Sequence, residues 1–177
     1  MTIMCNARQL LTQYAAYHRD RRNIATHFVG VPMIVFAVGV LLAGVHFVVN
    51  GVDLTAAWLA FALATAWYVT RGLAIGLATS AVVGALMLLA HPLASGSTAS
   101  WLGWGLGFFV VGWAIQFVGH YYEGRKPAFV DDLVGLLVGP MFVVAEWLFM
   151  LGWNRPLLQA IEAEVGPTVL RDLAHPA

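Results

Sequence analysis

The chain has 177 residues, of which 60% are hydrophobic and only 10% are charged, and its formal net charge is zero. Ordinary soluble domains are about 45–50% apolar and about 25% charged, so this composition excludes a soluble fold and predicts an integral membrane protein. The zero net charge gives no reason to expect nucleic acid as a partner, and the single cysteine excludes an internal disulfide.

Taken in chain order, the first predicted element is an amphipathic helix at the membrane surface over residues 1–23, whose apolar side chains recur at helical spacing. A second amphipathic piece and a tail occupy 154–177. Between them, apolar stretches that approach the length of a membrane crossing lie at 28–49, 54–69, 73–90, 101–122 and 133–153. We therefore predict an all-α, polytopic protein of about five transmembrane helices, with the bundle at 24–153 of a single domain 1–177.

Basic residues predict the orientation of this bundle. Alternating crossings would place all the basic side chains near the helix ends on one side, and the positive-inside tendency makes that side cytoplasmic. Five crossings put the C-terminus on the opposite side, and we prefer this arrangement. A break at Gly139-Pro140 would instead make the last segment re-entrant and return the C-terminus. The basic residues concerned are Arg8, Arg19, Arg21, Arg22, Arg71, Arg125 and Lys126.

Three of the six histidines fall at this cytoplasmic face. His18 and His27 flank the start of the first crossing, and His120 ends the fourth. A turn at 19–23, with Asn23 as the cap of the following helix, could bring the first two imidazoles together. Imidazoles at one depth suit iron, zinc or copper. The other three histidines are more typical of ordinary polar groups at the interface: His46, His91 and His175.

Polar residues near His120 extend this candidate site. Glu123 lies three residues further along the same helical face, where it could ligate the same ion, orient the imidazole or remain a solvated charge. Gln116 is on that face too, and it could bond a neighbouring helix instead. Glu146 lies deep in the last segment, where an unpaired carboxylate is costly. It would serve the site if that segment is re-entrant, or face Arg155 if it is not.

Two stretches resemble the 2-hydroxy fatty acid dioxygenase family, whose fungal members act in fatty acid α-oxidation in the endoplasmic reticulum membrane. Residues 17–32 read YHRDRRNIATHFVGVP and have the spacing His-x4-Asn-x3-His-x2-Gly-x-Pro. Residues 116–128 read QFVGHYYEGRKPA and have the spacing Gln-x3-His-x2-Glu-Gly-Arg. The resemblance runs from about Tyr14 to Glu146, although the intervening crossings match only in hydrophobicity.

The resemblance implies an Fe(II)-dependent dioxygenase that shortens a 2-hydroxy long-chain fatty acid by one carbon. The reaction R-CHOH-COOH + O2 → R-COOH + CO2 + H2O needs no further electron donor. The implied partners are the lipid substrate, O2 and membrane lipids, with the acyl tail between the apolar helices. We expect the inner membrane of a bacterium as the location, with the site at the cytoplasmic face. The implied catalytic residues are His18, His27, His120 and Glu123.

The same resemblance gives more specific roles to these residues. The three histidines would be the Fe(2+) ligands, and surrounding polar groups would orient the ligands or hold the substrate carboxylate. Two other functions remain open from the residues alone. One is a haem-binding membrane cytochrome with two axial histidines, and the other is a small transporter or structural membrane protein without chemistry. The surrounding polar groups in question are Asn23, Gln116, Arg125 and Lys126.

Overall fold

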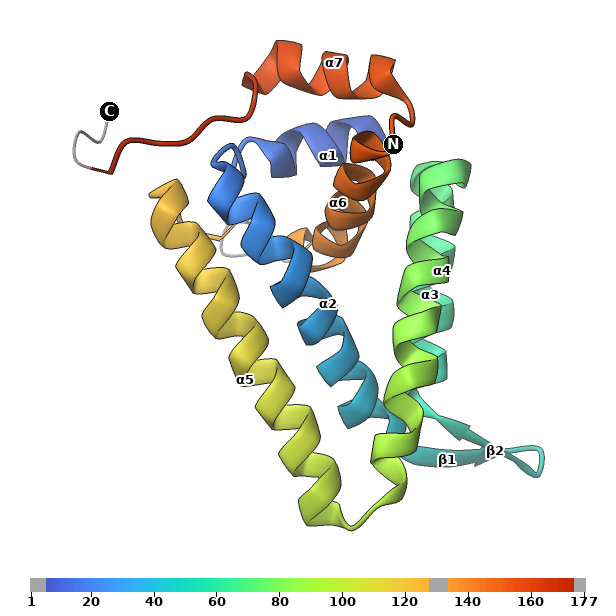
Figure 1. Ribbon diagram of the computed structural model, residues 1–177. Coiled ribbons are helices and arrows are strands. Elements are labelled where there is room, and N and C mark those ends of the chain that lie inside the picture. Colours follow the sequence, from blue (N-terminus) through green and yellow to red (C-terminus); the bar gives the residue numbers. More distant parts are fainter. Residues whose placement is uncertain (1–5, 128–133, 174–177) are drawn as a thin grey trace.

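The computed structural model describes residues 6–127 and 134–173 of the chain. The all-α prediction is confirmed, because helices make up nearly all of the regular structure (Figure 1). The elements are α1 (Ala7–Ala15), α2 (Arg21–Ala43), β1 (His46–Val49), β2 (Val52–Thr55), α3 (Ala56–Arg71), α4 (Leu73–Ala90), the 3-10 helix η1 (His91–Ser95), α5 (Thr98–Glu123), α6 (Gly135–Met150) and α7 (Arg155–Val165).

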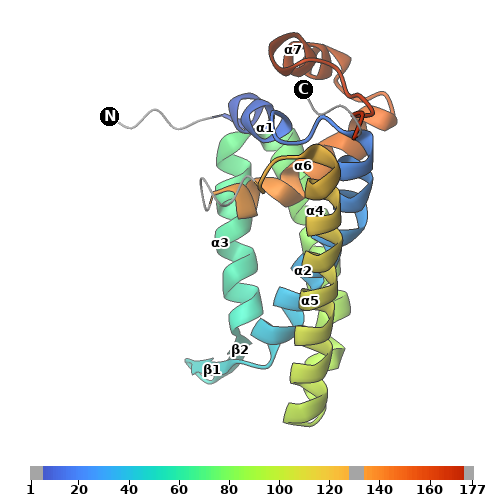
Figure 2. The ribbon, with the colours of Figure 1, turned by 90° about the vertical axis from the view of Figure 1, so that its left-hand side faces the viewer.

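Helices α2 to α5 run up and down between the two ends of the molecule, and α1 and α7 lie across one of these ends (Figure 1 and Figure 2). The two amphipathic helices expected from the sequence are confirmed as α1 and α7. Each turns its apolar face inward, where Leu11 and Ile161 are almost fully buried. The helices thereby cover the end of the bundle at which the chain begins.

Three described helical segments are long and apolar enough to cross a membrane: Arg21–Ala43, Leu73–Ser95 and Thr98–Glu123. The count becomes four if the bent pair α6–α7 is taken as one crossing. Helix α3 has 16 residues, fewer than the roughly 20 that a crossing takes, so the fifth crossing stays a prediction. Large apolar side chains such as Leu63, Leu77 and Val110 are exposed on the bundle, as contact with lipid would require.

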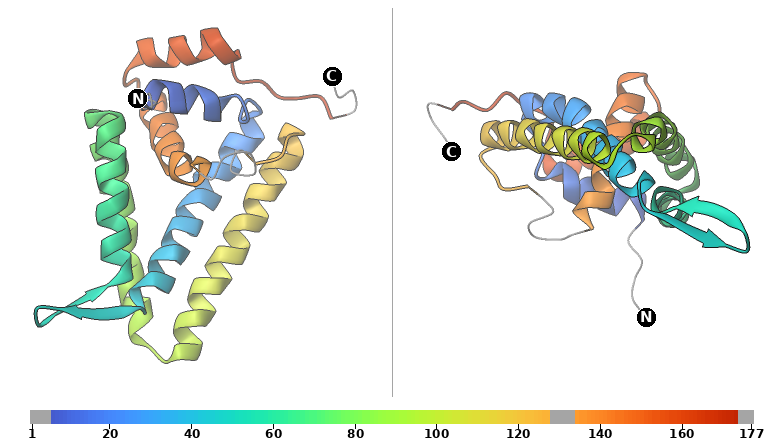
Figure 3. Two further views of the ribbon diagram at one scale, coloured as in Figure 1. Left: turned by 180° about the vertical axis from the view of Figure 1, so that it is seen from behind. Right: turned by 90° about the horizontal axis from the view of Figure 1, so that it is seen from below.

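The last apolar segment differs from the preferred arrangement, in which it crosses the membrane and leaves the C-terminus on the side opposite to the histidines. Its proline, Pro140, lies inside the continuous helix α6, and the chain bends by 117° between α6 and α7 instead. Viewed from behind, the orange helix α6 rises toward α1 (Figure 3). Arg19 Nη1 donates to Gly166 O at 2.8 Å, and Arg171 Nη1 donates to Glu123 O at 2.8 Å. The tail therefore returns to the end where α5 finishes, as in the re-entrant alternative.

A short β-hairpin joins α2 to α3, where the sequence indicated only a turn. Asn50 and Gly51 have φ values of 52° and 80°, the left-handed pair that a tight two-residue hairpin turn requires. The register pairs His46 with Thr55 and Val49 with Val52. This hairpin lies at the end of the bundle opposite to α1 (Figure 1).

Helices α2 and α5 pack closely because glycines face each other at their contact. A Cβ atom on Gly30 would lie 2.9 Å from the carbonyl oxygen of Gly112, and a Cβ on Gly112 would lie 3.1 Å from that of Gly30. Small residues permit this approach of backbones in membrane bundles. The contact holds the start of α2, which carries His27, beside the end of α5, which carries His120.

Candidate metal centre

The structure brings three histidines from distant parts of the chain into one buried cluster. The ring centroid of His18 lies 4.4 Å from that of His27 and 5.1 Å from that of His120, and the last two are 5.2 Å apart. One ring nitrogen from each histidine lies within 4.8 Å of the other two. Within residues 6–127 and 134–173, this is the one group of metal-ligand side chains gathered so closely.

Two of the imidazoles are oriented by backbone carbonyls. His18 Nδ1 lies 2.7 Å from Tyr14 O, and His27 Nδ1 lies 2.9 Å from Asn23 O. A carbonyl oxygen only accepts hydrogen bonds, so both Nδ1 atoms carry the proton and both Nε2 atoms expose a lone pair. This pairing of one nitrogen with a carbonyl is how proteins orient metal-binding histidines.

The two Nε2 atoms of His18 and His27 lie 3.0 Å apart. Two lone pairs at that distance repel each other unless a cation lies beside them. Burial, followed by the charge of His27, holds the pKa of His18 well below its usual value. The neutral imidazoles that result are the form that binds a metal ion, and an ion between the two nitrogens would remove the repulsion.

The third imidazole completes a donor set that fits a transition metal. His120 is buried, and its Nδ1 atom has no hydrogen-bond partner among the described residues. A buried nitrogen without a partner is unfavourable, and coordination of an ion would satisfy it. Three imidazole nitrogens suit iron, zinc or copper rather than magnesium or calcium. The residues present therefore fit the implied iron.

Glu123 holds the turn that presents His18. Its carboxylate accepts hydrogen bonds from the backbone N–H of Arg19 at 3.0 Å and of Asp20 at 2.9 Å, and from Asn23 Nδ2 at 3.0 Å. Glu123 is only 8% exposed, and it is not in the cluster of close ligand atoms. We infer that it positions His18 rather than ligating the ion.

The cap of α2 is Asp20, and the expectation of Asn23 in that role is wrong. Asp20 accepts a hydrogen bond from the backbone N–H of Arg22 at 2.8 Å, whereas Asn23 lies inside the helix and donates to Glu123. Hydrogen bonds from the Arg22 side chain lower the pKa of Asp20 to about 2, so its carboxylate is charged at neutral pH. It also accepts from the backbone N–H of Arg171 at 2.9 Å, which ties the tail to this turn.

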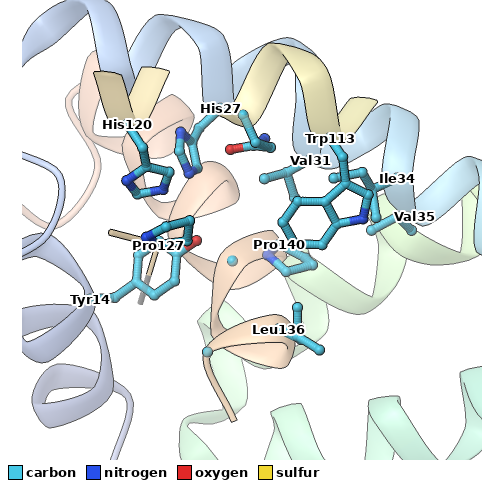
Figure 4. Close-up of a pocket in the computed structure, with 13 residues that line it drawn as sticks. Tyr14, His27, Val31, Ile34, Val35, Trp113, His120, Pro127, Leu136 and Pro140 are labelled. Carbon is cyan, nitrogen blue, oxygen red and sulfur yellow. The ribbon is translucent and has the colours of Figure 1, made fainter. Parts of the chain in front are cut away.

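A cavity of about 60 Å³ opens beside His27 and His120 (Figure 4), and Gln116 is among the residues that line it. Gln116 is 3% exposed, and neither Nε2 nor Oε1 of its carboxamide has a hydrogen-bond partner among the described residues. A Cβ atom on Gly30 would lie 2.6 Å from that Nε2, so only glycine leaves room for it. The carboxamide can therefore offer a donor and an acceptor to a molecule in the cavity. Tyr14, His27 and His120 line the same cavity.

Arg125 and Lys126, the two basic residues expected at the site, have different surroundings. Arg125 donates from Nη1 to Ala16 O at 2.9 Å and lines a separate polar pocket of about 590 Å³. This guanidinium is therefore used to hold the end of α1. Lys126 directly precedes Pro127, which lines the cavity beside the histidines.

His46 and His91 lie away from the cluster, whereas Glu146 lies at the same end of the bundle as the cluster. His46 pairs with Asp53 across the hairpin, at 3.1 Å, and the His91 ring lies 6.3 Å from Trp58. Both lie toward the opposite end of the bundle, and His175 is outside the described residues. Burial lowers the pKa of Arg19, and the charge of Glu146 opposes this. Glu146 therefore lies at the histidine end.

Tyr14 is a site residue that the sequence did not single out. Its ring stacks on His18 with the centroids 4.2 Å apart and the planes within 6° of each other. Tyr14 lies on the buried face of α1, and His18 follows it by four residues just after the helix ends; this spacing is the signal that could have identified the pair. Tyr14 also lines the cavity (Figure 4), so it limits the space in which a ligand of the cluster can lie.

These features define a class of protein: an apolar helical bundle with a buried three-histidine centre at one end. Residues 4–151 match the model of the family described as 2-hydroxy-palmitic acid dioxygenase Mpo1-like. The chain is also 32% identical over 165 residues to the 2-hydroxy-palmitic acid dioxygenase MPO1 of Saccharomyces cerevisiae, covering 92% of this chain and 91% of the yeast protein. No solved structure matches. The chain belongs to the Mpo1-like family.

Proposed function

We propose that this protein is an Fe(II)-dependent dioxygenase that converts a 2-hydroxy long-chain fatty acid into the fatty acid one carbon shorter, by α-oxidation. The observation that carries the proposal is the 3.0 Å approach of the Nε2 atoms of His18 and His27, next to His120. The name of the yeast relative supports the substrate class. In the overall reaction R-CHOH-COOH + O2 gives R-COOH, CO2 and water.

In this proposal the histidine cluster binds the metal ion, and residues at the cavity bind the substrate. When bound, ferrous iron would supply the binding and activation of O2 and of the 2-hydroxy acid. His18, His27 and His120 would hold it. Gln116 would donate to the carboxylate or hydroxyl of the substrate and accept from the hydroxyl proton, which fixes the orientation of C2. Lys126 would attract the carboxylate toward the cavity mouth.

The other functions left open by the sequence are less well supported. A haem with two axial histidines would lie between them, whereas the Nε2 atoms of His18 and His27 are only 3.0 Å apart. A transporter or structural protein without chemistry gives no reason to bury three imidazoles with facing lone pairs. Both alternatives predict a different outcome in the experiment below.

We further propose that the centre lies at the cytoplasmic face of a bacterial inner membrane. The basic residues support this orientation, because Arg22 and Arg125 lie at the histidine end of the bundle and basic residues favour the cytoplasmic side. The α3–α4 turn also lies there, since a Cβ on Gly72 would be 3.4 Å from Ala7, and Arg71 directly precedes it.

The proposal predicts the composition and the products of the purified protein. Protein reconstituted anaerobically with Fe(II) should bind one iron per chain, and 2-hydroxypalmitic acid should then consume O2 and yield the 15-carbon acid and CO2 in equal amounts. Oxygen electrode traces and product mass spectrometry measure this. Palmitic acid, which lacks the hydroxyl, should give no turnover. A Soret band would favour the haem alternative, and turnover unaffected by removal of iron would overturn the proposal.

A further inference from the structure

A second, larger cavity continues from the one beside the histidines into the apolar bundle. Its volume is about 320 Å³, and α2, α3, α4, α5 and α6 all contribute to its lining. The two cavities are adjacent, because five residues line both of them. Trp113 and Pro140 stand at this junction in Figure 4. The shared residues are Ile34, Val35, Trp113, Leu136 and Pro140.

The larger cavity runs away from the histidines along α2. Its lining residues on this helix start at Ile34 and end at Leu42, and His27 lies about two turns before Ile34. At 1.5 Å per residue, His27 and Leu42 are about 22 Å apart along the axis. The acyl chains of one bilayer leaflet fill about 15 Å, half of the hydrocarbon thickness. The path is thus long enough for a membrane-derived acyl chain.

We propose that this larger cavity, here called the acyl cavity, holds the acyl chain of the 2-hydroxy acid and that its far end limits the chain length. The inference rests on the proposed function, and it adds the residues that select the substrate. Apart from the hydroxyl of Tyr68 and the indole of Trp113, the side chains lining it are apolar. Its volume falls in the range of ligand pockets, roughly 300–1,000 Å³.

Two large side chains, Phe61 and Met87, line the part of the acyl cavity away from the histidines, and each lies against a glycine. A Cβ on Gly39 would lie 2.9 Å from Met87 Sδ, and a Cβ on Gly84 would lie 3.0 Å from Phe61 Cζ. Both side chains therefore pack closely against the backbone of a neighbouring helix. Between this part and the histidines, α3 contributes the small residue Ala64, which leaves space that a larger side chain would fill.

Filling this space tests the chain-length role. In Ala64→Phe we expect kcat/KM for 2-hydroxypalmitic acid to fall by about tenfold or more, because the ring would occupy the path of the chain. A 2-hydroxy acid of eight carbons, which ends before this point, should keep its rate within about twofold. Leu63→Phe is the matched control, since Leu63 is 65% exposed on the outer face of the same helix. An unchanged length profile in Ala64→Phe would overturn the proposal.

A crosslinking experiment on the unmodified protein separates this inference from the proposed chemistry. A 2-hydroxypalmitic acid analogue with a diazirine at the end of its chain is bound to the protein and photolysed, and the labelled residues are found by mass spectrometry. We expect labels at Leu42, Phe61 or Met87. Such labels without product formation would support the acyl cavity as the binding site and contradict the proposed reaction. Product formation with labels confined to outward-facing positions such as Leu63 would contradict the proposal that the acyl cavity holds the chain.

Discussion

Replacing any one of His18, His27 and His120 by alanine is expected to remove the bound iron and to lower turnover by more than about 100-fold. Loss of a partner outside the metal ligands already costs about 10–100-fold in metal affinity or activity, and these imidazoles are proposed to bind the ion directly. All three are buried, with one nitrogen each inside the same 4.8 Å cluster. Metal analysis and O2 consumption of the three variants measure the effect.

The matched control for these variants is His46→Ala. His46 is exposed and lies in the hairpin, where it pairs with Asp53, so its removal should change neither iron content nor turnover. Helicity and thermal unfolding in detergent should be recorded for each variant, with glutamine in place of alanine where the cavity left by alanine destabilises the bundle. Turnover that persists in any one of the three variants would remove that histidine from the ligand set.

Glu123→Gln is expected to lower the affinity for iron by about 10–100-fold and to reduce the thermal stability. The carboxylate accepts from the backbone N–H of Arg19 and Asp20 and from Asn23, and hydrogen bonds to a charged group contribute about 1.5–3 kcal/mol each. The glutamine amide would present N–H groups to these donors. The turn that carries His18 would then lose its anchor. Iron titration and thermal unfolding measure both effects.

Glu164→Gln is the control for this prediction, because Glu164 is an exposed carboxylate on α7. Turnover of Glu123→Gln should recover when the iron concentration is raised, since the ligands themselves remain. A variant that binds iron as tightly as the parent protein and still loses its activity would assign Glu123 a direct part in the reaction, in place of the positioning role.

Much of the site could be predicted from the sequence, because it depends on topology and local spacing. Alternating crossings were enough to place His18, His27 and His120 at one end of the bundle. The amphipathic pattern of the first helix likewise predicted the buried face that carries Tyr14. The polar face of Gln116 and Glu123 followed from helical spacing alone.

The wrong cap of α2 arose where residues far apart in the sequence bind each other. Asp20 and Asn23 were both reasonable caps for α2. Asp20 is the cap, and the side chain of Asn23 donates instead to Glu123, which lies 100 residues further along the chain. Arg125 was expected at the substrate, and its guanidinium donates to the carbonyl of Ala16 at the end of α1, so its role toward a substrate stays a prediction. Such outcomes depend on tertiary contacts that no local pattern contains.

The sequence left undecided whether the last apolar segment crosses the membrane or re-enters it, since this too depends on tertiary contacts. Pro140 indicated a break, yet α6 continues through it, and the chain bends after Met150 instead. Both α6 and α7 pack against α1. The hydrogen bonds of Arg19 and Asp20 with residues 166–171 then fix the tail at the histidine end.

The central claim is that three imidazoles share one ion, and X-ray absorption spectroscopy of the iron-loaded protein tests it most directly. We expect an iron spectrum with the multiple-scattering features of about three imidazole ligands at about 2.0–2.2 Å, together with oxygen donors and no sulfur. A first shell with one imidazole or none, or the four equatorial nitrogens of a porphyrin, would contradict the account.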